Sequence, residues 1–576
     1  MRTTYPEAYF NFCDVTALPD SKAASTSAKD FSQTGLLHDN VRQAAYGTME
    51  LNQFVLDGSR EIFPDEYPND VPYWSDEKSG SEGLYAKNPS LEISFTQAHS
   101  SIGLTLYFAE DIPEQIQITW YTLFGTKLIS KTFQPDQKKY FCSQQVQNYG
   151  KIIMEFTKST WPFRYAKLDY IEYGQMWLLG RNSIKSASVY EELDITGASL
   201  SINTAKVEIL DPDNDFELSN HDGLWKSLQK EQSIAVREYI DGDPVDCGTF
   251  YLDEWDCREN TVSFSMVDII GIMDKTQYYE GAVYEDAEAG DLIDSVMLSC
   301  GIEEYTVEEE VRKTKLSGWL GIQSHREALQ QIVFACGAVA DCSRSPGIRI
   351  YKPDRYVSRT IGLDRKFQGT QITLLDYVSS VTVSFYQYVP SQEAKQISKS
   401  ILPAGITKVE FREPCLPESI AVSAGEIIEA KTNYAVIQMG TAGECILSGR
   451  KYEETESAYT ASVQVIEAGE TASTKEYKGC TLMNMEQAKA AAEYILDYCQ
   501  LRQEVDMRYI NCGEAVGNWC SVALASGGHS VTGITGQTLD LSGGNLASAK
   551  CRGYSRASTS DYFTGGELYA GEEGII

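Results

Sequence analysis

The sequence has few of the residues that catalytic and metal sites require. Its five histidines stand alone, without an HExxH or HxH pair to hold a metal ion. A GxSxG elbow, a Walker A loop and a GxGxxG turn after a strand are also missing. We therefore predict no catalytic residue, no metal site and no cofactor, and we expect a protein that is not an enzyme.

Two chemical possibilities stay open. Paired carboxylates for glycoside hydrolysis leave no fixed spacing in a sequence, because the two groups meet only in the fold. Asp211, Asp213 and Asp215 begin like a calcium-binding loop. However, Phe216 stands where that loop has glycine and Asp222 where it has glutamate, so the pattern favours a solvated turn.

The 14 cysteines are scattered, without the CxxC pairs of a structural zinc site. Several occupy apolar positions, which favours buried free thiols in a reducing cytosol. No stretch approaches the apolar length of a membrane span, and the opening MRTTYPEAYFNF lacks a basic segment followed by an apolar run. We expect a chain that folds in the cytoplasm.

Basic residues are also few. The sequence has 49 Lys and Arg but 82 Asp and Glu, which gives a formal net charge of −33. This balance argues against a general nucleic-acid binder, because contacts with phosphates supply most of that affinity. DNA that meets this protein is expected to slide past its surface. In the alternative interpretation the acidic charge only keeps a large protein soluble. The length of 576 residues predicts roughly three to five domains.

The clearest pattern lies in residues 186 to 270. Apolar residues alternate over 195 to 209, a DPDND turn follows, and a short helical turn is predicted over 224 to 228. Two further strands are predicted at 248 to 255 and 261 to 266. A closed or nearly closed small β-barrel with one helical turn would bury all of these faces.

Regular short strands also fill residues 89 to 175, and this spacing predicts a β-sandwich. Five aromatic residues lie near strand ends and loops of this region: Trp120, Tyr121, Trp161, Phe163 and Tyr165. Rings of this kind can cover the apolar face of a pyranose, which predicts a possible glycan contact. In the alternative interpretation they are core residues.

Three helices are predicted at residues 291 to 300, at 324 to 336, and at 485 to about 500. The second begins with SHRE, which has the form of a capping box, and an asparagine precedes the third. Between these two helices, 371 to 388 predicts one long alternating strand, and 405 to 478 predicts a small inserted sandwich.

Three groups of strings carry a resemblance to known proteins. The first is SIKSASVYEELD, followed by SINTAKVEILDPDNDFELSN, LWKSLQKEQSIAV and GTFYLDEW. The second is GWLGIQSHREALQQIVFACGAVADCSRSPGIRIY, and the third is VGNWCSVAL followed by SVTGITGQTLDLSGGNLASAKCRG. Together they resemble the tail hub family of tailed phages and prophages of Gram-positive gut bacteria, which includes baseplate hubs and tail-associated tail-tip proteins. The resemblance covers roughly residues 175 to 556 and concerns the fold.

The resemblance implies a homotrimer in which each subunit contributes two similar barrels, so that six barrel units face a hexameric tail tube or distal tail protein. Here the barrels would span about 176 to 285 and 500 to 556, completed by strands from 365 to 400. Further implied partners are a tail fibre or spike protein and the tape-measure protein. The implied location is the virion tail, assembled in the host cytoplasm, with DNA only in passage through an acidic lumen.

We therefore expect a mainly β, multidomain fold with α+β parts, comprising two hub-type barrels, a small α+β domain and two β-sandwiches. The expected segments are 1–88 (arm or cap), 89–175 (galactose-binding-like sandwich, with possible carbohydrate binding), 176–285 (first barrel), 286–364 (α+β domain), 365–404 (strands completing the barrels), 405–478 (inserted sandwich), 479–556 (helix and closing barrel) and 557–576 (tail).

The first functional interpretation is a structural hub that terminates the tail tube, joins it to fibres or a spike, and lets DNA pass. The alternative is a host-surface glycan-binding or glycan-cleaving β-protein of a phage tail. A component of a phage-like contractile injection particle would share the fold and the trimer.

Overall fold

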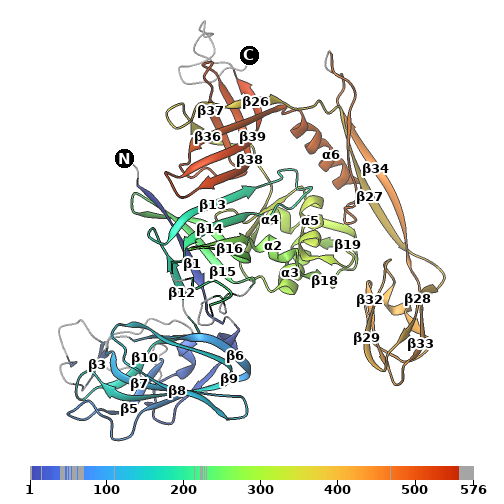
Figure 1. The fold of residues 1–576 in the computed structure, drawn as a ribbon. Helices are drawn as coiled ribbons and strands as arrows, with labels where there is room; N and C mark the ends of the chain where they lie inside the picture. The colour runs from blue at the N-terminus through green and yellow to red at the C-terminus, as the bar shows by residue number, and fades with distance from the viewer. Residues whose placement is uncertain are drawn as a thin grey trace. The chain divides into compact units, whose positions relative to one another are not determined.

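The computed structural model describes residues 3–14, 16–38, 46–48, 50, 53–54, 61–62, 71–108, 111–174, 176–212, 214–220, 225, 228, 230–466 and 469–556. These residues form a mainly β chain with several sheets and a few helices, which confirms the predicted fold class (Figure 1). The predicted tail lies outside the described residues, as do parts of the calcium-like turn and of the helical turn.

The chain separates into two compact units. Unit 1 comprises residues 1–8, 179–214 and 233–576, and unit 2 comprises residues 9–178 and 215–232. Strands β1 (Thr4–Asn11) and β12 (Met176–Leu179) run from one unit into the other.

Unit 2 is built on one large antiparallel sheet with the strand order β11-β6-β9-β7-β8, and β2 pairs with β6. Its strands are β2 (Lys22–Ala24), β6 (Ser90–Tyr107), β7 (Pro113–Tyr121), β8 (Lys127–Phe133), β9 (Lys139–Ser159) and β11 (Tyr170–Glu172). Smaller elements are α1 (Ala17–Asp20), a 3₁₀ helix (Thr34–His38), and the strand pairs β3 (Tyr46–Gly47) with β4 (Glu61–Ile62) and β5 (Tyr73–Lys78) with β10 (Tyr165–Leu168).

Burial in unit 2 follows the strand period of two. Ile152, Met154 and Phe156 on β9 are completely buried, and the residues between them are only half-buried. They share one hydrophobic cluster with Leu37 and Tyr73. Residues before position 89 therefore contribute to the core of unit 2.

Unit 1 contains a continuous sheet with the path β15-β16-β17-β14-β13-β38-β39-β36-β26. Its strands are β13 (Ile184–Glu192), β14 (Thr204–Leu210), β15 (Ser233–Ile240), β16 (Asp243–Arg258), β17 (Thr261–Val267), β26 (Gln371–Leu374), β36 (Gln503–Ile510), β38 (His529–Asp540) and β39 (Leu546–Arg556). In addition, β37 (Trp519–Ala523) pairs with β38 and, in parallel, with β25 (Val357–Ile361).

The pairing of β13 with β38 joins the two stretches that the sequence predicts as barrels, and it places Val189 opposite Leu539. Both of these side chains are buried. Within the described residues the path does not return to its first strand, so the number of closed barrels stays a prediction.

The middle of unit 1 is an α+β region. Its elements are α2 (Ile269–Met273), β18 (Gln277–Tyr278), β19 (Val283–Glu288), α3 (Ala289–Cys300), β20 (Tyr305–Val307), α4 (Glu309–Arg312), β21 (Lys315–Trp319), β22 (Gln323–Ser324), α5 (His325–Ala335), β23 (Val339–Asp341) and β24 (Ile348–Tyr351).

All three predicted helices are confirmed. Helix α3 ends at Gly301, whose φ of 72° suits a residue without a side chain. A capping box begins α5, in which Ser324 and Glu327 each accept from the other's backbone N–H. The third helix is α6 (Met485–Cys499), where Asn484 and Gln487 form the same arrangement.

The strand predicted over 371 to 388 is two strands, β26 and β27 (Ser380–Pro390). Strand β26 pairs with β36, whereas β27 pairs with β34 (Tyr452–Ser462) and β35 (Thr474–Tyr477). The chain changes sheet at the buried residues Tyr377 and Val378, so different partners divide the segment.

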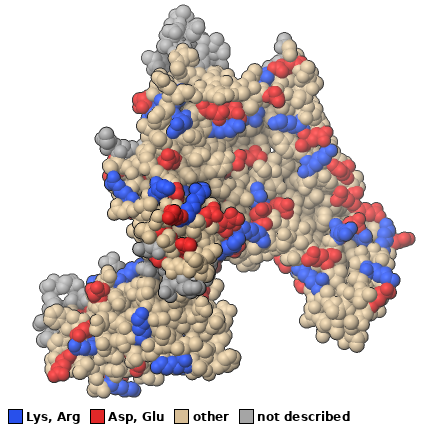
Figure 2. Space-filling view, viewed as in Figure 1, with Lys and Arg blue, Asp and Glu red and all other residues tan. Residues whose placement is uncertain are grey.

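The β27–β34 hairpin leads into a small inserted module made of two three-stranded sheets, β28-β33-β30 and β29-β32-β31. Its elements are β28 (Lys395–Leu402), β29 (Gly405–Glu410), a 3₁₀ helix (Pro417–Ser419), β30 (Ala421–Val422), β31 (Glu426–Ala430), β32 (Tyr434–Met439) and β33 (Gly443–Gly449). Acidic side chains gather over the hairpin (Figure 2), whose strand β34 carries Glu453, Glu454 and Glu456.

A buried polar network crosses the junction of the long sheet. Arg344, from the α+β region, places its Nε 3.0 Å from Glu191 Oε1 on β13 and donates through Nη2 to the backbone carbonyl of Glu514 at 2.6 Å. Gln537 on β38 donates to Glu191 Oε2 at 2.7 Å. Arg365 donates to Glu514 Oε1 at 2.8 Å. The network thus joins the first strands, the α+β region and the closing strands.

Its charges are deeply buried, with both Glu191 and Glu514 about 1% exposed. Burial alone would raise the pKa of Glu514, but the hydrogen bonds from Arg365 and from the Cys512 backbone, together with the charge of Arg365, outweigh it and the pKa is lowered. For Arg344, burial acts to lower the pKa, and the charge of Glu191 raises it overall. Both charged groups are therefore stabilised by their partners.

All 14 cysteines lie in the described residues and are free thiols, ten of them buried. Burial raises the pKa of Cys247 to about 12, which keeps it protonated. Among the described helices, none combines the length and apolar character of a membrane-crossing segment.

We expect Glu191→Ala to lower the free energy of unfolding of unit 1 by about 3–5 kcal/mol, because it leaves the Arg344 guanidinium buried without its partner carboxylate. Urea titration followed by tryptophan fluorescence measures this change. The double variant Glu191→Met with Arg344→Met is expected to regain most of the loss, because it removes both charges. A single variant within about 1 kcal/mol of the natural protein would contradict the role given to the network.

Candidate functional site

The structure separates the five aromatic residues predicted for glycan contact. Trp120 and Tyr121 end β7, whereas Trp161 and Phe163 lie in the loop after β9 and Tyr165 begins β10. Pairing of β7 with β9 sets Tyr121 opposite Lys151 and Pro113 opposite Ser159. The two groups therefore lie at opposite ends of β7, roughly 25 Å apart at about 3.3 Å per residue.

Trp120 does not reach the surface. It is completely buried and packs against Phe133 with ring centroids 6.5 Å apart. Its side chain lies on the same buried face of β7 as those of Ile116 and Ile118, which precede it by four and two residues. For Trp120 the prediction of glycan contact is corrected to a core position.

The remaining residues differ in how much of the ring is available. Trp161 is 62% exposed and Phe163 is 45% exposed. The Tyr165 ring stacks on Trp74 at 6.3 Å, and the Lys29 ammonium lies 5.0 Å from its centroid. Lys151 similarly covers the Tyr121 ring at 5.2 Å. Trp161 and Phe163 therefore have the most accessible ring surface of the set.

Sequence reasoning missed a second exposed tip in unit 2. Phe124, in the turn between β7 and β8, is 95% exposed, and Leu123 beside it is 44% exposed. The available signal was an aromatic residue directly before a turn glycine, because a side chain at that place has no sheet neighbour to cover it.

The buried side chain of His99 links the first residues of unit 2 to its large sheet. His99 on β6 is 3% exposed and lies between two carboxylates, with Nδ1 2.9 Å from Asp14 Oδ2 and Nε2 2.9 Å from Asp20 Oδ2. Burial acts to raise the pKa of Asp14, but hydrogen bonds from Thr16 and His99 lower it overall. Hydrogen bonds from Thr96 and then His99 lower the pKa of Asp20.

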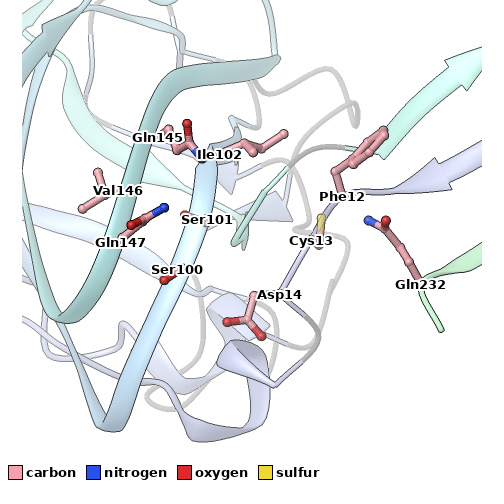
Figure 3. A pocket seen from close by; sticks show the side chains of 10 residues that line it. All are labelled: Phe12, Cys13, Asp14, Ser100, Ser101, Ile102, Gln145, Val146, Gln147 and Gln232. Carbon is pink, nitrogen blue, oxygen red and sulfur yellow. The ribbon is translucent and has the colours of Figure 1, made fainter. Parts of the chain in front are cut away.

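Beside this cluster lies a small cavity of about 60 Å³. Figure 3 shows its lining, in which Ser100, Ser101 and the amides of Gln145 and Gln147 surround the space together with Asp14 and Gln232. The cavity is polar but holds only a few water molecules. It is too small to enclose a sugar ring.

Burial raises the pKa of the Asp268 carboxyl group in unit 1 to about 6. Its oxygens accept from the backbone N–H groups of Asn203 at 2.7 Å and Gly271 at 3.0 Å, and from the Cys342 thiol at 2.9 Å. Asp268 thus caps α2 and occupies no cavity. Among the described residues, no group of three His, Cys, Asp or Glu is placed to hold a metal ion.

A second surface of interest is the end of the long sheet in unit 1. All four residues of β26 are exposed, including Ile372 at 45% and Leu374 at 66%. In the segment that precedes β26, Tyr356, Leu363 and Phe367 are 75%, 56% and 44% exposed. An uncovered apolar edge of this kind invites pairing with another chain.

Next to this edge, a groove of about 370 Å³ crosses the face of the same sheet. Its lining includes Tyr190 and Glu192 from β13, Asp506 and Arg508 from β36, and Lys550 from β39. The groove therefore spans the junction of β13 with the closing strands and carries both signs of charge.

We expect His99→Gln to lower the melting temperature of unit 2 near neutral pH by roughly 3 °C or more, because two carboxylates lose their shared partner. Lowered aspartate pKa values contribute stability above the ordinary aspartate range, and this stability is lost as the pH falls through the folded-state values. The difference between natural protein and variant should therefore shrink in acid. Calorimetry at several pH values measures it, with the exposed His529→Gln as control, and a difference that grows in acid would contradict the assignment.

No protein-family model matches the sequence, and no curated protein matches it. Among solved structures, the chain is similar to a tail protein from Neisseria meningitidis MC58, with 10% identity, a TM-score of 0.40, and 64% of this chain and 92% of that chain covered. It is similar to the 43 kDa tail protein of prophage MuSo2 from Shewanella oneidensis, with 11% identity, a TM-score of 0.38, and 66% and 95% covered. It is also similar to SpX-3, a fucose binding module from Streptococcus pneumoniae, with 13% identity, a TM-score of 0.19, and 26% and 91% covered. Tail proteins, one of them from a prophage, are thus among its structural neighbours.

Proposed function

We propose that this protein is a structural subunit of a phage or prophage-derived tail, a hub that forms a trimeric ring at the end of the tail tube. The observation that supports this most is the shared sheet of unit 1. The first strands and the closing strands pair through β13 and β38 and are fixed by the buried network around Glu191. Two barrel-like halves held rigidly in one subunit are what a ring of six similar units from three chains requires.

The apolar end of the sheet supplies the contact between subunits. Strand β26 exposes its full length, and a lone subunit with this edge uncovered would be prone to uncontrolled pairing. Ring closure covers such an edge without leaving an open end for further growth. The groove beside it, between Glu192 and Lys550, gives the neighbouring subunit a concave surface with paired charges.

The other partners follow from this role. The ring faces a hexameric tail tube or distal tail protein, carries a fibre or spike protein, and contacts the tape-measure protein. The chain acts within the virion tail after assembly in the host cytoplasm. Its formal charge of −33 keeps DNA from adhering during passage through the ring.

A second role, contact with host-surface glycan, is proposed for unit 2. Trp161 and Phe163 support it, because both are exposed and they lie two residues apart on one loop of unit 2. Binding of glycan, without its cleavage, is the role proposed here.

We expect the purified protein to have a mass of about three times 64.1 kDa by light scattering, and Leu374→Glu to shift it to a single chain. The introduced carboxylate would be buried in the contact between subunits, where an unpaired charge is costly. Negative-stain images should show a three-fold ring for the natural protein.

The matched control is Ile401→Glu, which alters a residue of the inserted module that is 80% exposed. This variant should remain trimeric. A natural protein that stays monomeric at micromolar concentration contradicts the ring, and a trimer that survives Leu374→Glu contradicts the assignment of the edge.

A further inference from the structure

Several hydrogen bonds fix the loop between β9 and β10. The Ser159 hydroxyl lies 2.7 Å from the carbonyl of Trp161, and Thr160 Oγ1 donates to the carbonyl of Ile112 at 2.6 Å. After the loop, the Arg164 backbone N–H donates to Ser79 Oγ at 3.0 Å. The backbone of Trp161 is therefore fixed on both sides.

Two buried ion pairs also hold the residues that follow this loop. The Arg164 guanidinium lies 3.0 Å from Asp111, and Lys167 lies 2.7 Å from Glu50. All four of these side chains are at most 11% exposed. Ion pairs of this depth fix geometry more than they add stability, because desolvation offsets most of their attraction.

Phe163 has a φ of 58°, the left-handed region that a bulky side chain rarely adopts. Its N–H donates to the carbonyl of Gly80 at 3.4 Å, so the turn at 80 to 84 lies against the loop. Such strain persists only where the surrounding structure imposes it, and it is concentrated at binding sites. Here it accompanies a side chain that is 45% exposed rather than buried.

Three apolar side chains of these two turns face solvent: Leu84, Trp161 and Phe163, which are 52%, 62% and 45% exposed. Summed over the three side chains, the exposed area is on the order of a few hundred Å². A stable protein interface needs roughly 800 Å² on each partner. The size of the patch therefore points to a small ligand with a flat apolar face.

We propose that this surface, the Trp161 platform formed by Leu84, Trp161 and Phe163, stacks against the C–H face of a pyranose. The inference rests on the glycan contact proposed for unit 2, and it places that contact at one end of the sandwich only. Tyr121 and Trp120 take no part, and Arg164 acts as a positioning residue beneath the loop. The ring of the sugar lies on the indole, and its hydroxyl groups remain at the polar rim.

The segment that carries the Trp161 loop is electrically neutral overall. Residues 89 to 175 carry eight Lys or Arg and eight Asp or Glu, a net charge of zero, so the whole formal excess of −33 comes from the rest of the chain. Lys158 beside the loop is paired with Glu114 at 2.6 Å. Beside Trp161 the loop therefore presents no unpaired lysine that would select an anionic ligand.

The test uses the full-length protein on an array of immobilised neutral pyranosides: galactose, glucose, fucose, rhamnose and the two N-acetylhexosamines. Binding of at least one is expected, and Trp161→Ala should weaken it about tenfold or more, because an aromatic stacking surface is lost. Trp161→Phe, which keeps a ring, should retain more binding than Trp161→Ala. Light scattering and calorimetry on the same samples check assembly and folding.

The matched control is Phe124→Ala, which removes an even more exposed ring at the opposite end of the sandwich. It should leave sugar binding unchanged. A natural protein that binds none of the pyranosides overturns the glycan contact, while its trimeric mass leaves the hub proposal standing. Binding that survives Trp161→Ala, or that is lost in Phe124→Ala, overturns the Trp161 platform.

Discussion

The buried contact between Glu191 and Arg344 is the constraint on which the arrangement of unit 1 depends. It is placed where β13 meets β38, and it extends through Gln537 and Glu514 to Arg365. An apolar contact at this position would hold the sheets together with similar free energy, yet it would tolerate sliding between the strands. Hydrogen-bonded charges tolerate far less, because any slip of register leaves a group unpaired in a medium of low dielectric constant. The network therefore sets how the two halves of the sheet are aligned.

Local features of the sequence predicted the helices well. The capping pairs Ser324 with Glu327 and Asn484 with Gln487 lie three residues apart, so the interactions that start α5 and α6 are visible in the sequence itself. The break at Tyr377 was not visible in this way. Residues 371 to 388 alternate throughout, and only their distant partners on β36 and β34 divide them into two strands. The network around Glu191 was hidden for the same reason, since Arg344 lies 153 residues from Glu191 and Gln537 lies 346 residues from it.

The aromatic residues of unit 2 show that the strand period of two, applied residue by residue, would have improved the prediction of which side chains are exposed. Trp120 shares its parity with Ile116 and Ile118, and that alternation predicts an inward side chain. Trp161 follows the end of β9 and precedes a proline, so no alternation assigns it to a core. Residue type alone treats the two tryptophans alike, whereas their place relative to the strand period separates them.

The distribution of charge connects the two proposed roles. Because residues 89 to 175 are neutral, every surplus carboxylate belongs to the rest of the chain, including the segments proposed to surround the passing DNA. Surplus carboxylates repel the passing DNA only when they lie near the lumen. The field of exposed charges decays over about 8–10 Å at physiological ionic strength, so more distant carboxylates have little effect. A surface that meets sugars at the host has the opposite need, because a strong negative field would oppose approach to anionic cell-wall polymers. The neutral stretch from residue 89 to 175 therefore suits contact with sugars, while the acidic excess is carried by the remaining residues of both units.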